Sequence, residues 1–242
     1  MKNCEKMKLS KSKINTYLKC PLEFKFQYID EIEVEPNKYM VLGTDVHSVA
    51  ESFADKFGDE LDNVNIENEL LKIANDLDLS YDIETHVENL GIFFNEVFVD
   101  GHYKLFSQEE YLHDETHRFS GICDIILEDK NGDLVVIDYK TSNSNSFSKY
   151  RRELCYYKLL VENVYEREVS KVGIFFTKNG RLRLLDVADE DNKRKFLSST
   201  EIEEAVDTFY EVRNQVNNKN FYPKYQFLCR YCTYKKICDE YF

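Results

Sequence analysis

The fold is decided by the stretch GICDIILEDKNGDLVVIDYKT, which occupies residues 121–141. It holds two apolar runs rich in β-branched residues, 122–127 and 134–137, separated by a polar segment that contains Asn131 and Gly132. An Asn-Gly pair between two such runs is the strongest short-range signal for a β-hairpin. The stretch therefore predicts two antiparallel strands at the centre of the fold.

Each predicted strand carries an acid where core residues are expected, Asp124 inside the first strand and Asp138 at the end of the second. A carboxylate beside buried apolar residues must be paired or bound to a metal. Asp138 and Lys140 are two residues apart, so they point to one face of their strand while Tyr139 points to the other. Two converging carboxylates with an ammonium beside them suit a hard divalent cation and a phosphate. An ion pair at a sheet edge, with a purely structural role, is the alternative that this stretch leaves open.

The length and composition are those of a globular protein. The chain has 242 residues, 43% hydrophobic and 14% aromatic, which is enough for one large domain with a sizeable core. No apolar run is long enough to cross a membrane, so we expect no membrane association. The first residues are charged and lack an apolar signal core, which predicts a cytoplasmic protein. In that reducing compartment the seven cysteines are expected to be thiols or metal ligands rather than disulfides.

The net charge of −13 is unevenly distributed. Residues 31–110 hold twenty acids against four lysines, a net of −16, and residues 111–215 hold twenty acids against sixteen basic residues, a net of −4. Both ends are basic, because residues 1–30 hold seven lysines against three acids and residues 216–242 hold five basic residues against two acids. If the ends meet in space, they form a phosphate-attracting patch on an otherwise acidic protein. The alternative is that these charges only solvate separate faces.

Apolar spacing predicts the order of helices and strands. A first helix over residues 11–20 is capped by Ser10, and a later helix is opened by Gly43, capped by Thr44 or Asp45 and closed by Gly58. The acidic residues 59–104 are expected to form a helical insertion or lid. Further helices are expected over residues 22–29, 149–163 and 201–216, strands over 109–119, 172–177 and 181–187, and a polar loop over 142–148. This order predicts an α/β or α+β fold around a mixed central sheet.

The C-terminal segment contains Cys229, Cys232 and Cys238 in a C-x2-C-x5-C pattern. Three cysteines this close in a cytosolic protein indicate a metal site. A fourth ligand must come from elsewhere, and Cys20, just before Pro21 in the basic N-terminal arm, is the candidate. Four thiolates hold either zinc or an iron–sulfur cluster, and the spacing does not decide between them. If Cys20 joins the C-terminal cysteines, the two ends of the chain are held together.

Five short motifs follow one another along the chain: CPLEF at residues 20–24, GTDVH at 43–47, GICD at 121–124, DYKT at 138–141, and the C-terminal cysteines. In this order they resemble the RecB-like branch of the PD-(D/E)XK nucleases. More closely, the chain resembles the single-domain iron–sulfur exonucleases associated with CRISPR systems and their phage relatives. The likeness covers nearly the whole chain except residues 59–104.

The resemblance implies an α/β, restriction-endonuclease-like fold with a mixed central sheet flanked by helices. Residues 1–242 would form a single nuclease domain. Its parts would be a nuclease core (40–58 and 107–190), a helical insertion (59–104) and a terminal iron–sulfur lobe (1–35 and 216–242).

The resemblance also implies roles for individual residues. His47, Asp124 and Asp138 would be metal ligands, together with the backbone carbonyl of Tyr139. Lys140 would orient the attacking water or stabilise charge developing on the phosphate.

A later helix motif of the family matches Leu154 and Tyr157, and Tyr157 would contact DNA. Glu153 stands where the family usually has Gln, and an ionised Glu cannot donate the hydrogen bond that Gln can. The residues expected to be catalytic are thus Asp124, Asp138, Lys140 and Tyr157. The residues expected to hold a [4Fe–4S] cluster are Cys20, Cys229, Cys232 and Cys238.

The expected function is a Mg2+- or Mn2+-dependent DNA nuclease, an exonuclease on single strands or DNA ends. Two alternatives remain: a non-catalytic DNA-end-binding subunit of a CRISPR-adaptation or recombination complex, and a zinc-stapled structural protein. The expected partners are DNA and the proteins of such a complex, and a homo-oligomer is compatible with the sequence. The expected location is the cytoplasm of a bacterium or of a phage-infected host.

The other histidines, His86, His102, His113 and His117, are assigned no role. Six aromatic residues are expected either to pack around the cluster or to stack on bases: Tyr17, Phe24, Phe26, Tyr28, Tyr222 and Tyr225.

Overall fold

The computed structural model describes residues 7–61, 63–101, 103–142, 147–188 and 195–241. Cys4, His102 and most of the polar loop predicted over 142–148 lie outside the described residues. The chain divides into two compact units. The terminal unit comprises Met1–Pro36, Asp114–Ser120 and Glu203–Phe242, and the sheet unit comprises Asn37–His113 and Gly121–Ile202.

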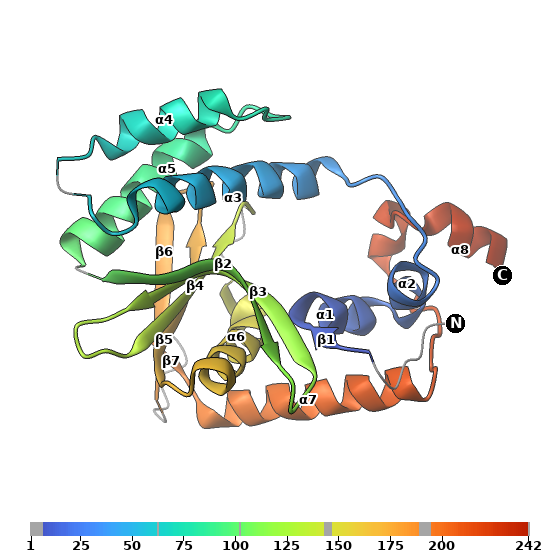
Figure 1. Cartoon of the computed structure of the whole chain (residues 1–242). Helices are drawn as coiled ribbons and strands as arrows, with labels where there is room; N and C mark the ends of the chain where they lie inside the picture. Colours follow the sequence, from blue (N-terminus) through green and yellow to red (C-terminus); the bar gives the residue numbers. More distant parts are fainter. Residues whose placement is uncertain (1–6, 62, 102, 143–146, 189–194, 242) are drawn as a thin grey trace. The chain divides into compact units, whose positions relative to one another are not determined.

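The sheet unit is built on a mixed sheet, as the sequence predicted (Figure 1). Antiparallel pairs join β3 to β4 and β5 to β6, whereas β4 pairs with β5, and β6 with β7, in parallel. Strand β2 pairs with β3. The bounds are β2 Lys104–Asp114, β3 Phe119–Glu128, β4 Leu134–Lys140, β5 Val169–Phe176, β6 Arg181–Val187 and β7 Phe196–Leu197.

The hairpin predicted from residues 121–141 is confirmed as β3 and β4, with Ile125 opposite Ile137. Its turn is closed by Asp129, whose Oδ1 accepts hydrogen bonds from the backbone N–H groups of Asn131 (2.8 Å) and Asp133 (3.1 Å). Gly132 has φ +88°, a conformation that a side chain would strain.

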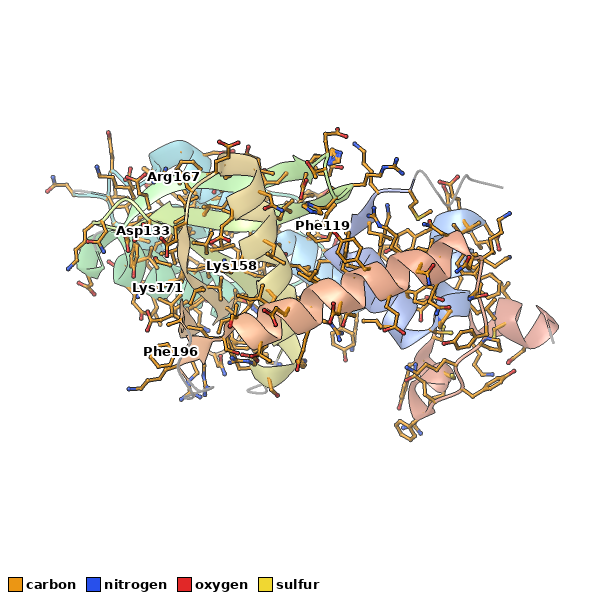
Figure 2. All side chains as sticks on the ribbon, turned by 90° about the horizontal axis from the view of Figure 1, so that it is seen from below. Phe119, Asp133, Lys158, Arg167, Lys171 and Phe196 are labelled. Atoms are coloured by element: carbon orange, nitrogen blue, oxygen red, sulfur yellow. The ribbon has the colours of Figure 1, made fainter. Side chains whose placement is uncertain are left out.

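Arg167, just after helix α6 (Arg151–Tyr165), holds the hairpin turn from the next connection in the chain. Its guanidinium donates to the backbone O of Gly132 and pairs with Glu128 at 2.7 Å. Figure 2 labels Arg167 and Asp133 at this end of the sheet. The hairpin is thus tied down at its turn as well as along its strands.

Helices cover both faces of the sheet in this unit (Figure 1). One face is covered by α3 (Lys38–Phe57), α4 (Ile66–Asp76) and α5 (Glu84–Phe94), and the other by α6. The apolar side chains of α3, α4 and α5 form one core cluster with those of β3, β4 and β5. The acidic residues 59–104 are helical, as predicted, and they share the core of the sheet, which a detached lid would not.

The predicted start of α3 is wrong. The helix begins at Lys38 and is capped by Asn37, whose side chain accepts from the N–H groups of Tyr39 and Met40 at 3.0 and 3.2 Å. Gly43 therefore lies inside the helix, and Asp45 accepts a hydrogen bond from the backbone of Ser80 instead of capping. The first turn was not predicted because residues 39–42 form a continuous apolar run without helical spacing. The predicted end at Gly58, with φ +57°, is confirmed.

The strand predicted over residues 109–119 is also wrong, because a turn divides it. Strand β2 ends at Asp114 and β3 starts at Phe119. The carboxylate of Asp114 accepts from the backbone N–H of His117 (3.1 Å) and pairs with its Nδ1 (2.6 Å). This local side-chain capping competes with continued strand pairing.

The terminal unit brings the two ends of the chain together. It contains β1 (Leu9–Ser10), which pairs with Phe119 and Ser120 of β3, and α1 (Lys11–Lys19), for which the predicted cap Ser10 is confirmed. The C-terminal segment joins the N-terminal helices through bonds from Leu22 N to the backbone O of Tyr222 (3.1 Å) and from Tyr17 Oη to that of Asn220 (2.6 Å). The remaining helical segments are α2 Pro21–Phe24, a π-helical turn Lys25–Ile29, most of α7 Ser199–Asn217, a 3-10 turn Phe227–Tyr231 and α8 Lys235–Tyr241. None of the helices within the described residues has the length and apolar character to cross a membrane.

Two glycines give opposite predictions for stability. At Gly173 in β5, a Cβ atom would lie 2.5 Å from Leu184 Cδ2 and 2.6 Å from the backbone O of Arg183. We expect Gly173→Ala to lower the free energy of unfolding by ~1–3 kcal/mol through overpacking. At Gly43 a Cβ atom meets nothing within 4 Å, so Gly43→Ala should raise it by ~1 kcal/mol through helix propensity. Urea denaturation measures both, and equal midpoints for the two variants would contradict the packing of β5 on β6.

Candidate active site

Three side chains from distant parts of the sheet unit meet at one point. The imidazole of His47, on α3, places Nδ1 3.0 Å from Glu109 Oε1, on β2, and Nε2 3.7 Å from Asp124 Oδ2, on β3. One ligand atom from each residue lies within 4.8 Å of the others. Among the described residues, this is the group of His, Cys, Asp and Glu side chains gathered closely enough to hold a metal ion. Two members, His47 and Asp124, were predicted as ligands from the sequence.

Glu109 was not predicted as a site residue, since the sequence marks it only as the first residue of a strand. In the structure its backbone adopts φ +43° in the middle of β2. A non-glycine residue in this region is uncommon and marks a local distortion of the strand. The adjacent Glu110 pairs instead with Tyr165 and Ser107. Two consecutive acids gave no sign of which one would face His47.

Asp124 is held by the hairpin itself. The residue is 7% exposed, and its Oδ2 accepts a hydrogen bond of 2.6 Å from the backbone N–H of Tyr139. The residue precedes the paired position Ile125–Ile137, so it lies next to Asp138 across the two strands. The ring of Tyr139 belongs to the apolar core and meets the His47 ring edge-on, with 5.7 Å between the centroids.

Asp138 is organised differently from Asp124. It is 2% exposed, its Oδ1 accepts from the hydroxyl of Tyr157 at 2.8 Å, and its Oδ2 forms an ion pair with Lys140 Nζ. Lys140 Nζ also lies 3.8 Å from Glu153 Oε2. The structure therefore brings the predicted residues together as two adjoining groups, His47–Glu109–Asp124 and Asp138–Lys140–Tyr157.

The carboxylates set the charge of the two basic residues. Burial by itself lowers the pKa of His47, but Asp124, Glu109 and Asp138 outweigh it and raise that pKa to about 9. Burial likewise opposes the charge of Lys140, and Asp138, Glu153 and Asp124 raise its pKa. Both residues are therefore cationic at neutral pH. The positive charge of each residue offsets the negative charge of partly buried carboxylates. The same carboxylates would also attract an added cation.

Thr177, at the end of β5, connects helix α5 to the backbone of Lys140. The backbone N–H of Thr177 donates to the O of Lys140 at 3.0 Å, and its hydroxyl lies 2.7 Å from His86 Nδ1. Asn89 donates to the backbone O of Thr177 at 2.8 Å. His86 is buried, and burial followed by the charge of Lys178 lowers its pKa. This histidine is part of the packing that supports the strand end.

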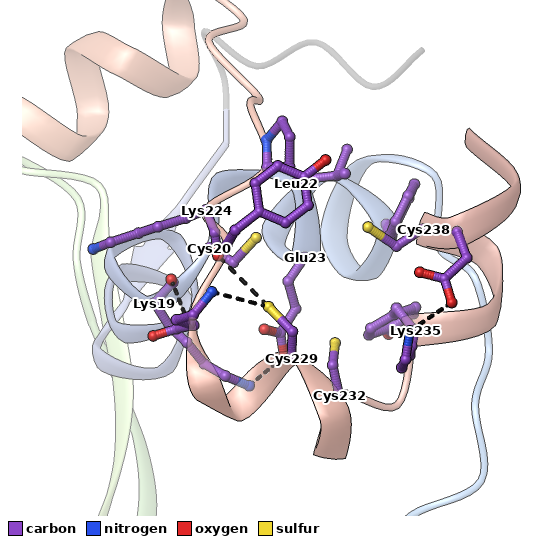
Figure 3. Close-up of a pocket in the computed structure, with 15 residues that line it drawn as sticks. Lys19, Cys20, Leu22, Glu23, Lys224, Cys229, Cys232, Lys235 and Cys238 are labelled. Atoms are coloured by element: carbon purple, nitrogen blue, oxygen red, sulfur yellow. Dashed lines mark hydrogen bonds and ion pairs between the residues drawn. The ribbon is translucent and has the colours of Figure 1, made fainter. Parts of the chain in front are cut away.

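The four predicted cluster cysteines lie together in the terminal unit. Cys20, Cys229, Cys232 and Cys238 all line a single cavity of about 160 Å³, and Figure 3 shows their sulfur atoms around it. Cys229 Sγ accepts a hydrogen bond from the backbone N–H of Gln226 at 3.3 Å. The remaining described cysteines, Cys123 and Cys155, are buried in the sheet unit.

Comparisons with known proteins bear on this site. The family model of the PD-(D/E)XK nuclease superfamily matches residues 8–239. A crystal structure from Eubacterium rectale, described as “Putative exonuclease”, superposes with a TM-score of 0.54 at 12% identity, covering 96% of this chain and 88% of that one, and this likeness concerns the fold alone. The crystal structure of SSO0001 has 16% identity and a TM-score of 0.34, covering 91% of this chain and 94% of that one, and carries no argument. No curated protein sequence matches the chain. Since the family model spans nearly the whole sequence, the chain belongs to the PD-(D/E)XK nuclease superfamily.

Proposed function

We propose that this protein is a Mg2+- or Mn2+-dependent deoxyribonuclease that acts as an exonuclease on single-stranded DNA or DNA ends. The observation that carries the proposal is the 3.7 Å approach of His47 Nε2 to Asp124 Oδ2 beside the Asp138–Lys140 pair. Superfamily membership supports the nuclease chemistry. The five ordered motifs support placement in the RecB-like branch, close to the CRISPR-associated iron–sulfur exonucleases.

The donor set fits a divalent cation. In this proposal His47, Asp124 and Asp138 hold the ion together with the carbonyl of Tyr139, and Glu109 adds a further carboxylate beside His47. Imidazole and carboxylate ligands together suit Mn2+ well, and carboxylates suit Mg2+. A bound ion would lower the pKa of a water molecule and polarise a phosphoryl oxygen.

Lys140 both neutralises Asp138 and acts on the phosphate in this proposal. Its ammonium is paired with Asp138, which it neutralises in a buried position. A cation beside Asp138 competes for that carboxylate and leaves the ammonium available to a phosphate or to the attacking water. The hydroxyl of Tyr157, 2.8 Å from Asp138 Oδ1, keeps the carboxylate oriented meanwhile. Glu153 is placed to attract Lys140 at 3.8 Å, a role that a neutral Gln would not perform.

We further propose that the four cysteines of the terminal unit bind a [4Fe–4S] cluster with a structural role. Four thiolates around one zinc ion lie about 3.8 Å apart, given Zn–S bonds of about 2.3 Å. Among the described residues, no cysteine belongs to a set of three or more His, Cys, Asp and Glu side chains whose ligand atoms all lie within 4.8 Å of one another. A cluster of four irons spaces its thiolates more widely, and the shared cavity offers it room.

The proposed setting is the cytoplasm of a bacterium or of a phage-infected host, with CRISPR-adaptation or recombination proteins as partners. A non-catalytic DNA-end-binding subunit is the second candidate. It is favoured by the net charge of −13 and by Glu153 at the position where the family usually has Gln.

We expect the wild-type protein with Mn2+ to degrade end-labelled linear single-stranded DNA and to leave circular single strands intact. Asp124→Asn and Lys140→Ala should lower the rate by at least ~100-fold, because each removes a charge that acts on the transition state. The matched control is Glu51→Gln, the same loss of a carboxylate on an exposed position of α3 one turn from His47. Labels at the 5′ and 3′ ends report polarity. Binding without cleavage would support the second candidate, and equal rates for all variants would refute the assigned site.

Metal binding should release a proton at neutral pH. The pKa of His47 is raised to about 9 in the metal-free protein, so the imidazole is protonated below that pH and must lose its proton to become a ligand. Affinity for Mn2+ should therefore rise about tenfold per pH unit up to pH ~9. Isothermal titration calorimetry in buffers of different ionisation enthalpy measures the released proton. His47→Gln should abolish the release, and an unchanged release in that variant would exclude His47 as a ligand.

Anaerobically purified protein should be brown and contain about four irons per chain. Cys232→Ala should lose the iron and lower the melting temperature, because the cluster joins the two ends of the chain. The control variant Cys155→Ala, which removes a buried thiol of the sheet unit, should keep its iron. Colourless protein that contains stoichiometric zinc would refute the cluster and show that the four cysteines form a zinc site.

A further inference from the structure

The terminal unit carries a run of large aromatic side chains on its surface. Tyr222, Tyr225, Phe227 and Tyr231 are 57%, 75%, 70% and 69% exposed. Single exposed aromatics are normal on a protein surface, but a cluster of them marks an interaction site. Other aromatics considered for base stacking, Tyr17, Phe24 and Phe26, are buried in the unit and are excluded from such a role.

Most of these exposed rings do not belong to the cysteine cavity. Tyr225 lines it, whereas Tyr222, Phe227 and Tyr231 do not. The 3-10 turn Phe227–Tyr231 explains the separation, because it directs Cys229 into the cavity. Residues three apart in such a turn lie on one side, which places Phe227 and Arg230 together. A group bound in the cavity would therefore leave Phe227 and Tyr231 facing solvent.

The guanidinium of Arg230 lies close to the rings of both Phe227 and Tyr231. The guanidinium carbon of Arg230 is 3.6 Å from the centroid of the Phe227 ring and 4.7 Å from that of Tyr231. A guanidinium stacked on an aromatic ring keeps its N–H edges available for a phosphate. Residues 216–242 hold five basic residues against two acids, a net of +3 in a chain of net charge −13. This surface is thus complementary to a polyanion.

We infer that Phe227, Arg230 and Tyr231 form a stacking platform for single-stranded DNA. The rings stack on unpaired bases, which every base permits through its π-face, and Arg230 binds the backbone phosphate. A protein partner would use exposed aromatics as well, but the local positive charge favours nucleic acid. The inference rests on the proposed function, since it assigns a binding surface to the substrate of that nuclease.

The test measures binding of the full-length protein, purified anaerobically, to fluorescein-labelled oligo(dT) by fluorescence anisotropy in EDTA. Phe227→Ala and Tyr231→Ala should each weaken binding about tenfold, the loss of one stacked base. An abasic oligonucleotide of the same length should bind weakly and equally to all variants. The matched control is Tyr39→Ala, because Tyr39 is 70% exposed with Lys38 Nζ 5.0 Å from its ring centroid but lies in the acidic segment of the sheet unit.

A salt series separates stacking from charge. The aromatic variants should keep the wild-type slope of log affinity against log salt, whereas Arg230→Ala should reduce it by ~0.7. Phe227→Trp should retain wild-type affinity, and unchanged iron content and melting temperature show that each variant is folded.

Wild-type affinity in the double variant Phe227→Ala/Tyr231→Ala, or equal wild-type affinity for the abasic strand, would overturn the platform. Cleavage of DNA with Mn2+ by the wild type in that case leaves the nuclease proposal intact. Ring-dependent binding without any cleavage supports the platform and refutes the nuclease proposal instead.

Discussion

The hydrogen bond from the backbone N–H of Tyr139 to Asp124 Oδ2, 2.6 Å long, joins the two strands on which the candidate site is built. A buried carboxylate is stable only with such partners. The bond fixes the position of Asp124 in the register of the β3–β4 hairpin, in which Asp138 lies on the neighbouring strand. Because the ring of Tyr139 packs in the apolar core on the opposite face, any shift of register would expose this ring and separate the acids.

Charge balance explains why the remaining site residues are where they are. Acids gathered in a partly buried place repel one another unless cations lie among them. In the metal-free protein His47 and Lys140 supply this positive charge. The same acids that raise the pKa of His47 are those that we propose as ligands of a cation. These ion pairs therefore stabilise the clustered acids, and in the proposed function a bound ion would compete with them.

The terminal unit meets a different physical demand. Its buried apolar side chains come from both ends of the chain and include Leu9, Ile14, Phe24, Phe209 and Val212. A smaller cluster of Leu22, Phe26 and Tyr234 packs against Cys20, Cys232 and Cys238. Cys20, Cys229, Cys232 and Cys238 line one cavity, so the cluster proposed for them would cross-link the two ends of the chain. The rings of Phe227 and Tyr231, on the 3-10 turn, remain exposed and available for binding.

Local sequence determined the hairpin, the cap at Ser10, the end of α3 at Gly58 and the cysteine spacing, since each depends on neighbours within a few residues. It also indicated Asp124 and Asp138, because acids in apolar strands are conspicuous, with Lys140 beside Asp138. His47 was indicated by the order of the family motifs. Only the tertiary structure decided that Glu109 rather than Glu110 meets His47, that Tyr157 holds Asp138, and which aromatics are buried. Those outcomes depend on contacts between residues that are far apart in the chain, 19 residues for Tyr157 and Asp138 and 62 for His47 and Glu109. The sequence carries no local signal for such contacts, because chain geometry over that distance is set by packing of the whole core.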